Sequence, residues 1–274
     1  MENKSPIGIF DSGYGGLTVF SEIQKLLPEY DFKYLGDNAR APYGDRSFEA
    51  VYEYTWEAVN WLLSSGCPLV IIACNTASAK ALRSIQQNEL LQYFPDRKVL
   101  GIIRPTAEII GSISHSGHIG ILATNGTVNS GSYLTEIGNF YPDLTVHQQA
   151  CPLWVPFIEN FLKNESSLEE IVRQDLQELF SADADIDTIL LACTHYPLIF
   201  DLLRNLLPPE IQIISQGEII ADSLQDYLYR HPEIQTLLSI GAQTHFHTTD
   251  DPIEFERHAT FFFGKPVRAS KIHL

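Results

Sequence analysis

The sequence lacks the features that would indicate a membrane protein or a nucleic-acid-binding protein. No apolar run is long enough to span a bilayer, and the first residues show no signal-peptide pattern, so we expect a cytoplasmic protein. The 274 residues include 34 acidic and 18 basic side chains, giving a formal net charge of −16. This charge argues against an extended surface for nucleic acid or for an acidic membrane. A small anionic substrate remains compatible with it, because a local site can override the global field.

Cysteine and lysine are both scarce, and this limits the cofactors that we expect. The four cysteines form no C-x-x-C pair, the close spacing in which metal ligands usually occur. We therefore expect no metal site, and no structural disulfides in a reducing cytoplasm. No lysine stands in a recognisable site motif, which leaves no evident Schiff-base residue for a pyridoxal cofactor. We expect a protein that works without a cofactor.

Two of the cysteines occur in similar surroundings. Apolar runs ending in Ala-Cys lead to Cys74 and to Cys193, and small polar residues and a new helical periodicity follow each. This pattern is typical of a buried strand, a tight turn and a helix. Another pair of similar strings, residues 8–13 and 120–126, precedes the two cysteines in the same order. We interpret the repetition as an internal duplication in which each α/β unit presents one cysteine.

Strand-like and helix-like segments alternate along the chain, which predicts an α/β fold with mainly parallel sheets. We expect two similar doubly wound domains, related by a pseudo-twofold axis, with the active site in the cleft between them. Ligands of open α/β sheets bind at the carboxyl ends of the strands, where both cysteines would lie. We also expect one helix over residues 76–93 and late edge strands over 243–249 and 260–263.

A glycine-rich turn joins the first predicted strand to its helix. The glycines at positions 13, 15 and 16 would let backbone N–H groups approach an anion. They do not fit the G-x-G-x-x-G spacing of dinucleotide-binding proteins. The alternative is a purely structural turn in which Asp11 caps the helix. The polar loop over residues 36–47 also has two interpretations. It could carry functional residues, or it could be a solvated connection in which Ser47 is the N-cap of the next helix.

Three interpretations of Cys74 and Cys193 remain open from the residues alone. A buried free cysteine is most often an apolar filler, which suits Cys67 and Cys151 better because polar residues follow the other two. Cys74, Cys193 and His195 could instead form a metal site or a thiol switch. The third interpretation is acid–base catalysis by two opposed thiols. One thiol would remove a proton from one face of a substrate and the other would deliver a proton to the opposite face, inverting a carbon centre.

The acid–base interpretation requires activated thiols. A free thiol has a pKa of about 8.5 and is only slightly ionised at neutral pH. Helix N-termini and nearby donors would have to lower that pKa. His195 could assist Cys193 and Asp11 could assist Cys74, although a buried structural histidine and a helix cap are the plainer alternatives.

The chain resembles the glutamate racemases, cofactor-independent members of the aspartate/glutamate racemase superfamily. The resemblance runs from Ile7 to Pro197 and continues weakly to the C-terminus. The matching motifs are GIFDSGYGGL at 8–17, GD at 36–37, Arg40, PYGDRS at 42–47, ACNTA at 73–77, SGSY at 130–133, CPL at 151–153 with Pro156 and Glu159, and CTHYPL at 193–198. Each motif is weak by itself, but their joint order and spacing are specific.

This resemblance implies a set of site residues. Cys74 and Cys193 would be the two catalytic acid/base residues, supported by Asp11 and His195 respectively, and Glu159 is a further candidate near the second thiol. Hydroxyls, amides and backbone N–H groups would bind the substrate, with no arginine clamp. The implied substrate-binding residues are Asp11, Ser12, Tyr43, Gly44, Asn75, Thr76, Thr194 and His195.

The resemblance also implies an organisation and a role. Residues 1–99 and a returning segment, 211–274, would form one domain, and residues 100–210 the other. The protein would interconvert L- and D-glutamate, supply D-glutamate for peptidoglycan synthesis, and form a homodimer, with no nucleic-acid or membrane partner. Two alternatives remain: a racemase of another acidic amino acid such as aspartate, or a non-catalytic thiol redox or binding protein. The chain departs from the family pattern at Arg104 and at Gln216.

Overall fold

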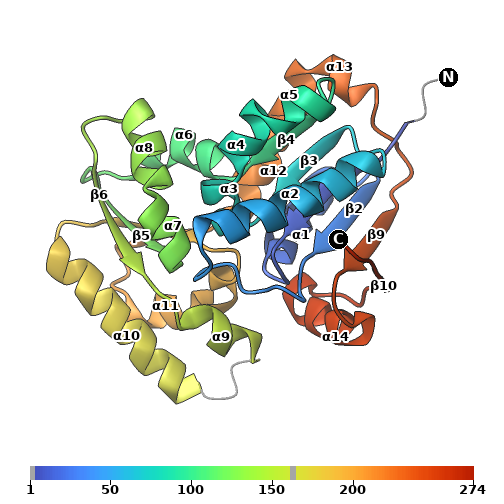
Figure 1. Ribbon diagram of the computed structural model, residues 1–274. Helices are drawn as coiled ribbons and strands as arrows, with labels where there is room; N and C mark the ends of the chain where they lie inside the picture. The colour runs from blue at the N-terminus through green and yellow to red at the C-terminus, as the bar shows by residue number, and fades with distance from the viewer. Residues whose placement is uncertain (1–3, 161–164) are drawn as a thin grey trace.

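Two parallel sheets form the centre of the molecule (Figure 1). The computed structural model describes residues 4–160 and 165–274. The prediction that the N-terminus carries no signal peptide concerns in part residues 1–3, which lie outside the described residues. The first sheet has the order β10-β9-β2-β1-β3-β4 and the second β6-β5-β7-β8. Every pair of named strands is parallel, which confirms the predicted α/β class.

Because all the strands of each sheet are parallel, their carboxyl ends lie at a common edge. The first sheet consists of β1 (Ile7–Asp11), β2 (Phe32–Gly36), β3 (Leu69–Ile72), β4 (Lys98–Gly101), β9 (Thr244–Thr248) and β10 (Ala269–Lys271). The second consists of β5 (His118–Ala123), β6 (Thr145–Ala150), β7 (Thr188–Ala192) and β8 (Gln212–Ile214). The order β2-β1-β3-β4 in the first sheet corresponds, strand for strand, to β6-β5-β7-β8 in the second. An internal duplication would produce this correspondence.

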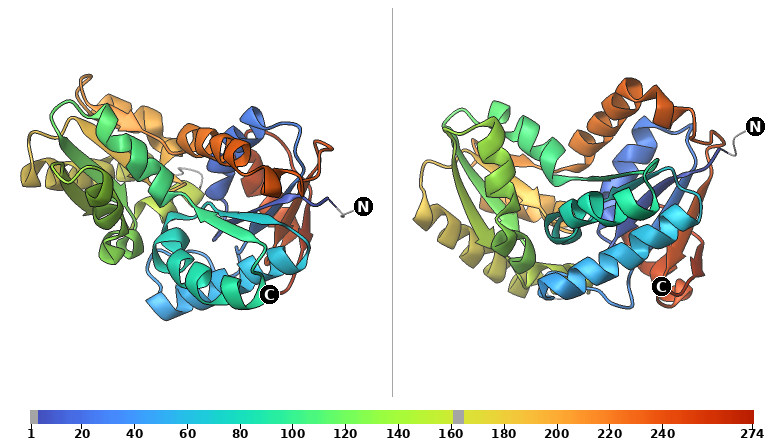
Figure 2. Two further views of the ribbon diagram at one scale, coloured as in Figure 1. Left: turned by 90° about the horizontal axis from the view of Figure 1, so that it is seen from above. Right: turned by 45° about the horizontal axis from the view of Figure 1, so that its top comes forward.

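Helices cover both faces of the sheets, as Figures 1 and 2 show. Those associated with the first sheet are α1 (Gly16–Leu26), α2 (Phe48–Ser64), α3 (Asn75–Lys80), α4 (Leu82–Gln87), α5 (Glu89–Tyr93), α12 (Gly217–Arg230), α13 (Pro232–Gln235) and α14 (Pro252–Phe263). Those associated with the second are α6 (Ile103–Ile113), α7 (Asn125–Ser130), α8 (Ser132–Phe140), α9 (Trp154–Glu159), α10 (Glu165–Ala182), the 3₁₀ turn η1 (Tyr196–Ile199) and α11 (Phe200–Leu206). Among the described residues, no helix is both long and apolar enough to cross a membrane.

Alternating side chains of the buried strands contribute to different cores. In β3, Leu69 and Ile71 join the core beneath α1 and α12, whereas Val70 and Ile72 join the core beneath α2. This period of two is the geometry of a strand buried on both faces, and it explains the continuous apolar runs in the sequence. Cys74 belongs to the core beneath α2, and Cys193 to the core that includes α1 and α12.

Three expectations about the elements need correction. Residues 260–263 are not a strand but the end of α14, whose buried residues Phe255, Ala259, Phe262 and Phe263 follow a helical spacing. Asp251 caps this helix by accepting from the Ile253 N–H, and Gly264 ends it with a positive φ of 75°. The expected helix over 76–93 is divided into α3, α4 and α5.

The third correction concerns the point at which the chain returns to the first sheet. Strand β8 pairs with β7 in the second sheet, whereas the predicted boundary at residue 211 assigned it to the first domain. The apolar side chains of β8 signalled a strand, but only the pairing reveals which sheet it joins. The chain returns to the first sheet through α12 and then β9 and β10. We propose a domain boundary just after Ile214.

Candidate active site

The register of the strands places both cysteines at the carboxyl edge of their sheets. Phe10 pairs with Ile72, and the Ala73 N–H donates to the Phe10 carbonyl at 2.8 Å, so Ser12 lies beside Cys74. In the second sheet Ala123 pairs with Ala192, which brings Thr124 and Cys193 to the same edge. The equivalent strands of the two sheets thus carry one thiol each to corresponding positions.

Both thiols line one small cavity of about 50 Å³ between the sheets. It is lined by Ser12, Gly13, Ala41, Pro42, Tyr43, Gly44, Asp45, Cys74, Asn75, Thr76, Thr124, Pro152, Val155, Pro156, Glu159, Cys193, Thr194 and His195. Every predicted site residue is in this set except Asp11, which lies buried behind the cavity with 1% of its surface exposed. A larger cavity of about 560 Å³ lies between α4, α6, α8 and α12, but neither Cys74 nor Cys193 lines it.

Cys74 is held as a buried, protonated thiol. It is the N-cap of α3, and its sulfur accepts from the Ala77 N–H at 3.4 Å and lies 3.4 Å from the Ser12 hydroxyl. Burial nevertheless raises the pKa of Cys74 to about 12, with the Asp11 carboxylate as the second cause, and the two donors offset this only in part. The lowered pKa that the helix N-terminus was expected to give is therefore absent at Cys74 in the substrate-free protein.

Cys193 lies beside a histidine that carries a proton at neutral pH. His195 Nδ1 is 3.9 Å from the sulfur, and Nε2 is 2.9 Å from Glu159 Oε1. Burial lowers the pKa of His195, but the contacts with Cys193 and Glu159 raise it more, to about 10. Glu159 is therefore linked to the second thiol through His195 and makes no hydrogen bond with it.

The His195–Glu159 contact predicts a pH dependence of stability. The folded-state pKa of His195, about 10, lies above its ordinary value of 6.5, so its stabilising contribution is complete below pH 6.5 and disappears as the pH rises through 10. Glu159→Gln removes the carboxylate, so the pKa of His195 should fall. The stability that protonated His195 contributes should then be lost at a lower pH than in the wild-type protein. Urea unfolding of both proteins at about pH 6, 8 and 10 measures this difference. Parallel pH profiles for the two proteins would contradict it.

Asp11 contacts the glycine-rich turn and makes no hydrogen bond to Cys74. Its Oδ2 accepts from the Gly13 N–H at 2.8 Å, and burial raises its pKa despite this bond and the positive charge of His195. The residue that is hydrogen-bonded to the Cys74 sulfur is Ser12. The support that Asp11 was expected to give Cys74 remains a prediction, and its only described link to that thiol is electrostatic.

The glycine-rich turn also packs against the second half of the chain. A Cβ atom placed on Gly15 would lie 2.3 Å from Thr194 Oγ1 and 2.4 Å from His195 Nδ1. One helical turn later, the Thr18 hydroxyl donates to the Thr194 carbonyl at 2.8 Å. Only glycine allows the backbone to come this close to the His195 ring. The turn therefore fixes the position of the histidine next to Cys193.

The polar loop before α2 forms one wall of the cavity, but two of its expected binding groups are already paired. The Tyr43 hydroxyl donates to Asp37 Oδ2 at 2.5 Å, and the same oxygen accepts from Arg40 Nε at 2.7 Å. The Gly44 carbonyl accepts from the Gly126 N–H at 2.7 Å, across the cavity. Tyr43 and Gly44 can thus contact a substrate through the ring and the backbone N–H, while the hydroxyl and the carbonyl hold the loop in place.

Thr124 also lines the cavity, although it is not among the site residues predicted from the sequence. Its hydroxyl lies 2.9 Å from that of Thr76, which also lines the cavity, and 3.2 Å from that of Thr127. The signal was present in the repeated strings, in which Thr124 occupies the position of Ser12.

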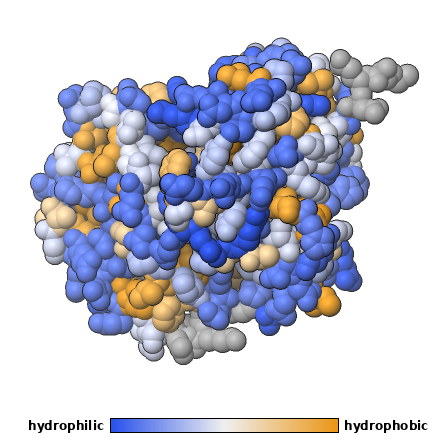
Figure 3. Space-filling view, viewed as in Figure 1, coloured by the Kyte–Doolittle hydropathy of each residue, from blue (hydrophilic) through white to orange (hydrophobic). Residues whose placement is uncertain are grey.

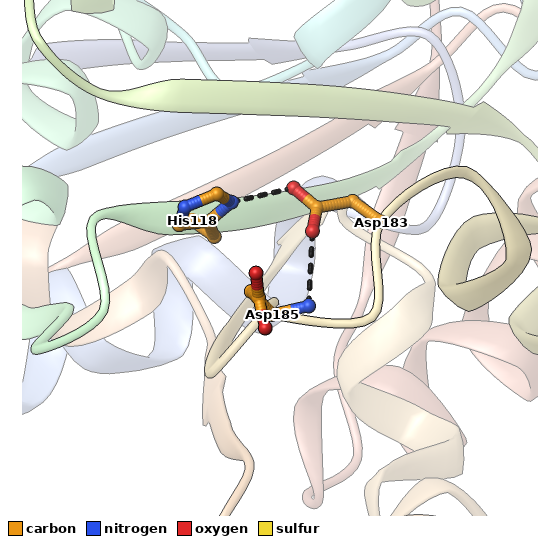
Figure 4. A group of neighbouring side chains, drawn as sticks. All are labelled: His118, Asp183 and Asp185. Atoms are coloured by element: carbon orange, nitrogen blue, oxygen red, sulfur yellow. Dashed lines mark hydrogen bonds and ion pairs between the residues drawn. The ribbon is translucent and has the colours of Figure 1, made fainter.

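The described residues include one cluster with the spacing of metal ligands, and it lies away from the thiols (Figure 4). It consists of His118, Asp183 and Asp185, at the amino end of β5, whereas Cys193 lies at the opposite edge of that sheet. His118 Nδ1 is 2.7 Å from Asp183 Oδ2, and Asp183 Oδ1 accepts from the Asp185 N–H at 2.9 Å. These contacts are those of an ion pair stabilising a loop, and the cluster plays no part in the candidate active site.

Comparisons with known proteins agree in the family that they indicate. A family described as Asp/Glu/Hydantoin racemase matches residues 14–224. The glutamate racemase of Persephonella marina is 38% identical over 268 residues, which cover 98% of this chain and 97% of that protein. The solved structure of a glutamate racemase isoform from Bacillus anthracis matches with a TM-score of 0.89 and 34% identity, covering 98% of each chain. That of the Francisella tularensis glutamate racemase in complex with D-glutamate matches with a TM-score of 0.84 and 28% identity, covering 100% of this chain and 98% of the other.

Proposed function

Because this chain belongs to the Asp/Glu/hydantoin racemase family, we propose that it interconverts L- and D-glutamate with Cys74 and Cys193 as its acid/base pair. The observation that carries the proposal is the convergence of two thiols, one from each sheet, on a single cavity. The D-glutamate bound to the Francisella tularensis relative supports the choice of substrate. The relatives that match over the whole chain are glutamate racemases. They give less support to aspartate as the substrate or to a non-catalytic redox role.

In the proposed reaction, one thiolate removes the α-proton of glutamate and the opposite thiol donates its proton to the other face of the same carbon. The first sulfur ends as a thiol and the second as a thiolate, so the proton count is unchanged and the enzyme is left ready for the reverse reaction. In the substrate-free protein, burial raises the pKa of Cys74 to about 12, which favours the thiol form at the first position. At the second position, the protonated His195 places a positive charge beside Cys193. The return to the starting state requires that the substrate or solvent redistribute this proton.

We further propose that neutral groups bind the substrate. Among the described residues that line the cavity there is no lysine and no arginine, which leaves hydroxyls, amides and backbone N–H groups to bind the carboxylates. The candidates are Ser12, Tyr43, Gly44, Asn75, Thr76 and Thr194, with His195 supplying charge from the cavity wall and Asp11 from behind it. Since no lysine amine faces the cavity, no residue there could form a Schiff base, and we propose a reaction without a cofactor.

The direct test is the optical activity of glutamate followed by circular dichroism in heavy water, with purified protein and no added cofactor. We expect the signal to decay to zero from either pure enantiomer, with solvent deuterium entering the α-position. Decay with aspartate and not with glutamate would move the substrate and keep the mechanism. A folded protein inactive toward both amino acids would overturn the racemase proposal.

The family resemblance supports three further proposals about the role of the protein. We propose that it supplies D-glutamate for peptidoglycan synthesis, that it is cytoplasmic, and that it forms a homodimer. On the face shown in Figure 3, hydrophobic residues form small separate patches and not one broad surface. Light scattering at several protein concentrations tests the dimer.

A further inference from the structure

Of the two departures from the family pattern, Gln216 is the one that reaches the candidate site. Arg104 lies exposed on α6 and pairs with Glu108 at 3.0 Å. Gln216 is 3% exposed, and its side-chain oxygen accepts from Asn75 Nδ2 at 2.7 Å. Asn75 immediately follows Cys74 and lines the cavity. Replacing Gln216 is therefore expected to affect substrate binding and not the protein surface.

Gln216, Asn75 and Tyr133 form a closed ring of three hydrogen bonds. Asn75 Nδ2 donates to Gln216 Oε1, Gln216 Nε2 donates to the Tyr133 hydroxyl at 2.8 Å, and that hydroxyl donates to Asn75 Oδ1 at 2.6 Å. All three residues are buried, where a polar group left without a partner costs more than it would in water. Each member of the ring gives one hydrogen bond and receives one.

The Thr106 hydroxyl donates to the Ile102 carbonyl and accepts from Gln216, which fixes the orientation of the Gln216 amide. With Gln216 in this orientation, the ring permits only one orientation of the Asn75 amide. A flipped amide would place Asn75 Oδ1 against Gln216 Oε1, two acceptors with no proton between them. In the observed orientation one N–H group of Asn75 is used in the ring. No acceptor is found for the second N–H in the described parts of the chain, and Asn75 lines the cavity. A donor without a protein partner at the edge of a substrate cavity is suited to an incoming carboxylate.

Gln216 is itself anchored where the chain crosses between the two sheets. Its Nε2 also donates to Thr106 Oγ1 at 2.8 Å, and Thr106 lies in α6, the helix between β4 and β5. Gln216 is the residue before α12, the helix between β8 and β9. The Gln216 side chain thus links the two segments of chain that pass between the sheets, and the same side chain orients Asn75.

We propose that Gln216 is a positioning residue, which together with Tyr133 fixes the Asn75 amide so that its remaining N–H group binds a substrate carboxylate. This inference rests on the proposed function, because it assigns a role within the same site. Gln216 and Tyr133 do not contact the substrate and act through Asn75. The ring binds the substrate and the transition state alike, so its loss should raise KM and leave kcat nearly unchanged.

The test compares Gln216→Met and Tyr133→Phe with the wild-type protein in the optical-activity assay. Both variants keep the approximate side-chain shape and break the ring, so we expect KM to rise about five- to tenfold for each enantiomer with kcat within about twofold. Thr188→Val is the matched control, because it removes the hydroxyl of another fully buried threonine, at the amino end of β7, and leaves the ring and its anchor intact. We expect its KM to stay within about twofold of wild type.

A double-mutant cycle separates positioning from a general structural effect. If Gln216 acts through Asn75, adding Gln216→Met to Asn75→Ala should raise KM by less than about twofold beyond Asn75→Ala alone. Additive effects, an unchanged KM in the single variants, or an equal rise in Thr188→Val would each overturn the positioning role. A wild-type protein without racemase activity would instead overturn the proposed function, before any variant is compared.

Discussion

Changing either Cys74 or Cys193 to serine should lower kcat/KM for glutamate racemisation by about 10²–10⁴-fold, the usual contribution of a positioned proton-transfer group. Serine nearly matches cysteine in shape, so each variant should retain the cavity, whose thiols are each 6% exposed. Its hydroxyl is a far weaker acid than a thiol and cannot exchange a proton with the α-carbon at a useful rate. Because each face of the substrate has its own thiol, one substitution is enough to stop inversion. Circular dichroism of both enantiomers measures the loss.

Cys67→Ser is the matched control for these variants. Cys67 is fully buried beneath α2 and lies outside the cavity, so its substitution tests the cost of placing a hydroxyl in a core without touching the chemistry. We expect racemisation within about twofold of wild type and a modest loss of stability. Cys74→Ser or Cys193→Ser proteins that retained more than a tenth of the wild-type rate would contradict the two-thiol mechanism.

Gly15→Ala is expected to produce the second large effect, although Gly15 has no functional group. The new methyl group would lie 2.3 Å from Thr194 Oγ1 and 2.4 Å from His195 Nδ1, so the turn or the histidine must move. Overpacking of this kind costs about 1–3 kcal/mol of folding free energy. A displaced His195 also moves the charge beside Cys193, and misplacement by about 1 Å can reduce a rate about 10²-fold. Urea unfolding and the racemisation assay measure the two effects separately.

Gly138→Ala provides the comparison for Gly15→Ala. Gly138 lies in α8, and a Cβ atom there would meet nothing within 4 Å. Alanine in a helix is favoured over glycine by about 0.5–1 kcal/mol, so this variant should be slightly more stable and fully active. A Gly15→Ala protein that behaved in the same way would show that the turn does not hold His195 in place.

The motifs of the candidate site could be found in the sequence because they are local. Apolar runs followed by Ala-Cys predicted strands that end in a thiol, and the parallel arrangement then required both thiols to lie at the carboxyl edge. The misassigned segments show the limit of this reasoning. The run of phenylalanines ending α14 carries both strand and helix propensity, and only its packing at helical spacing decides between them.

The sequence by itself determined the α/β class and the repeated strand–cysteine–helix unit, because strand and helix periodicities and turn chemistry depend on near neighbours. The family resemblance supplied the predicted site residues, and all of them except Asp11 line the cavity. Only the tertiary structure decided which polar atoms meet. Ser12 is hydrogen-bonded to Cys74, and Glu159 is linked to Cys193 through His195. Gln216 is hydrogen-bonded to Asn75, 141 positions away in the chain. Burial and such distant contacts also set the protonation of the buried groups. They follow from how the two sheets pack together, which no local pattern in the chain encodes.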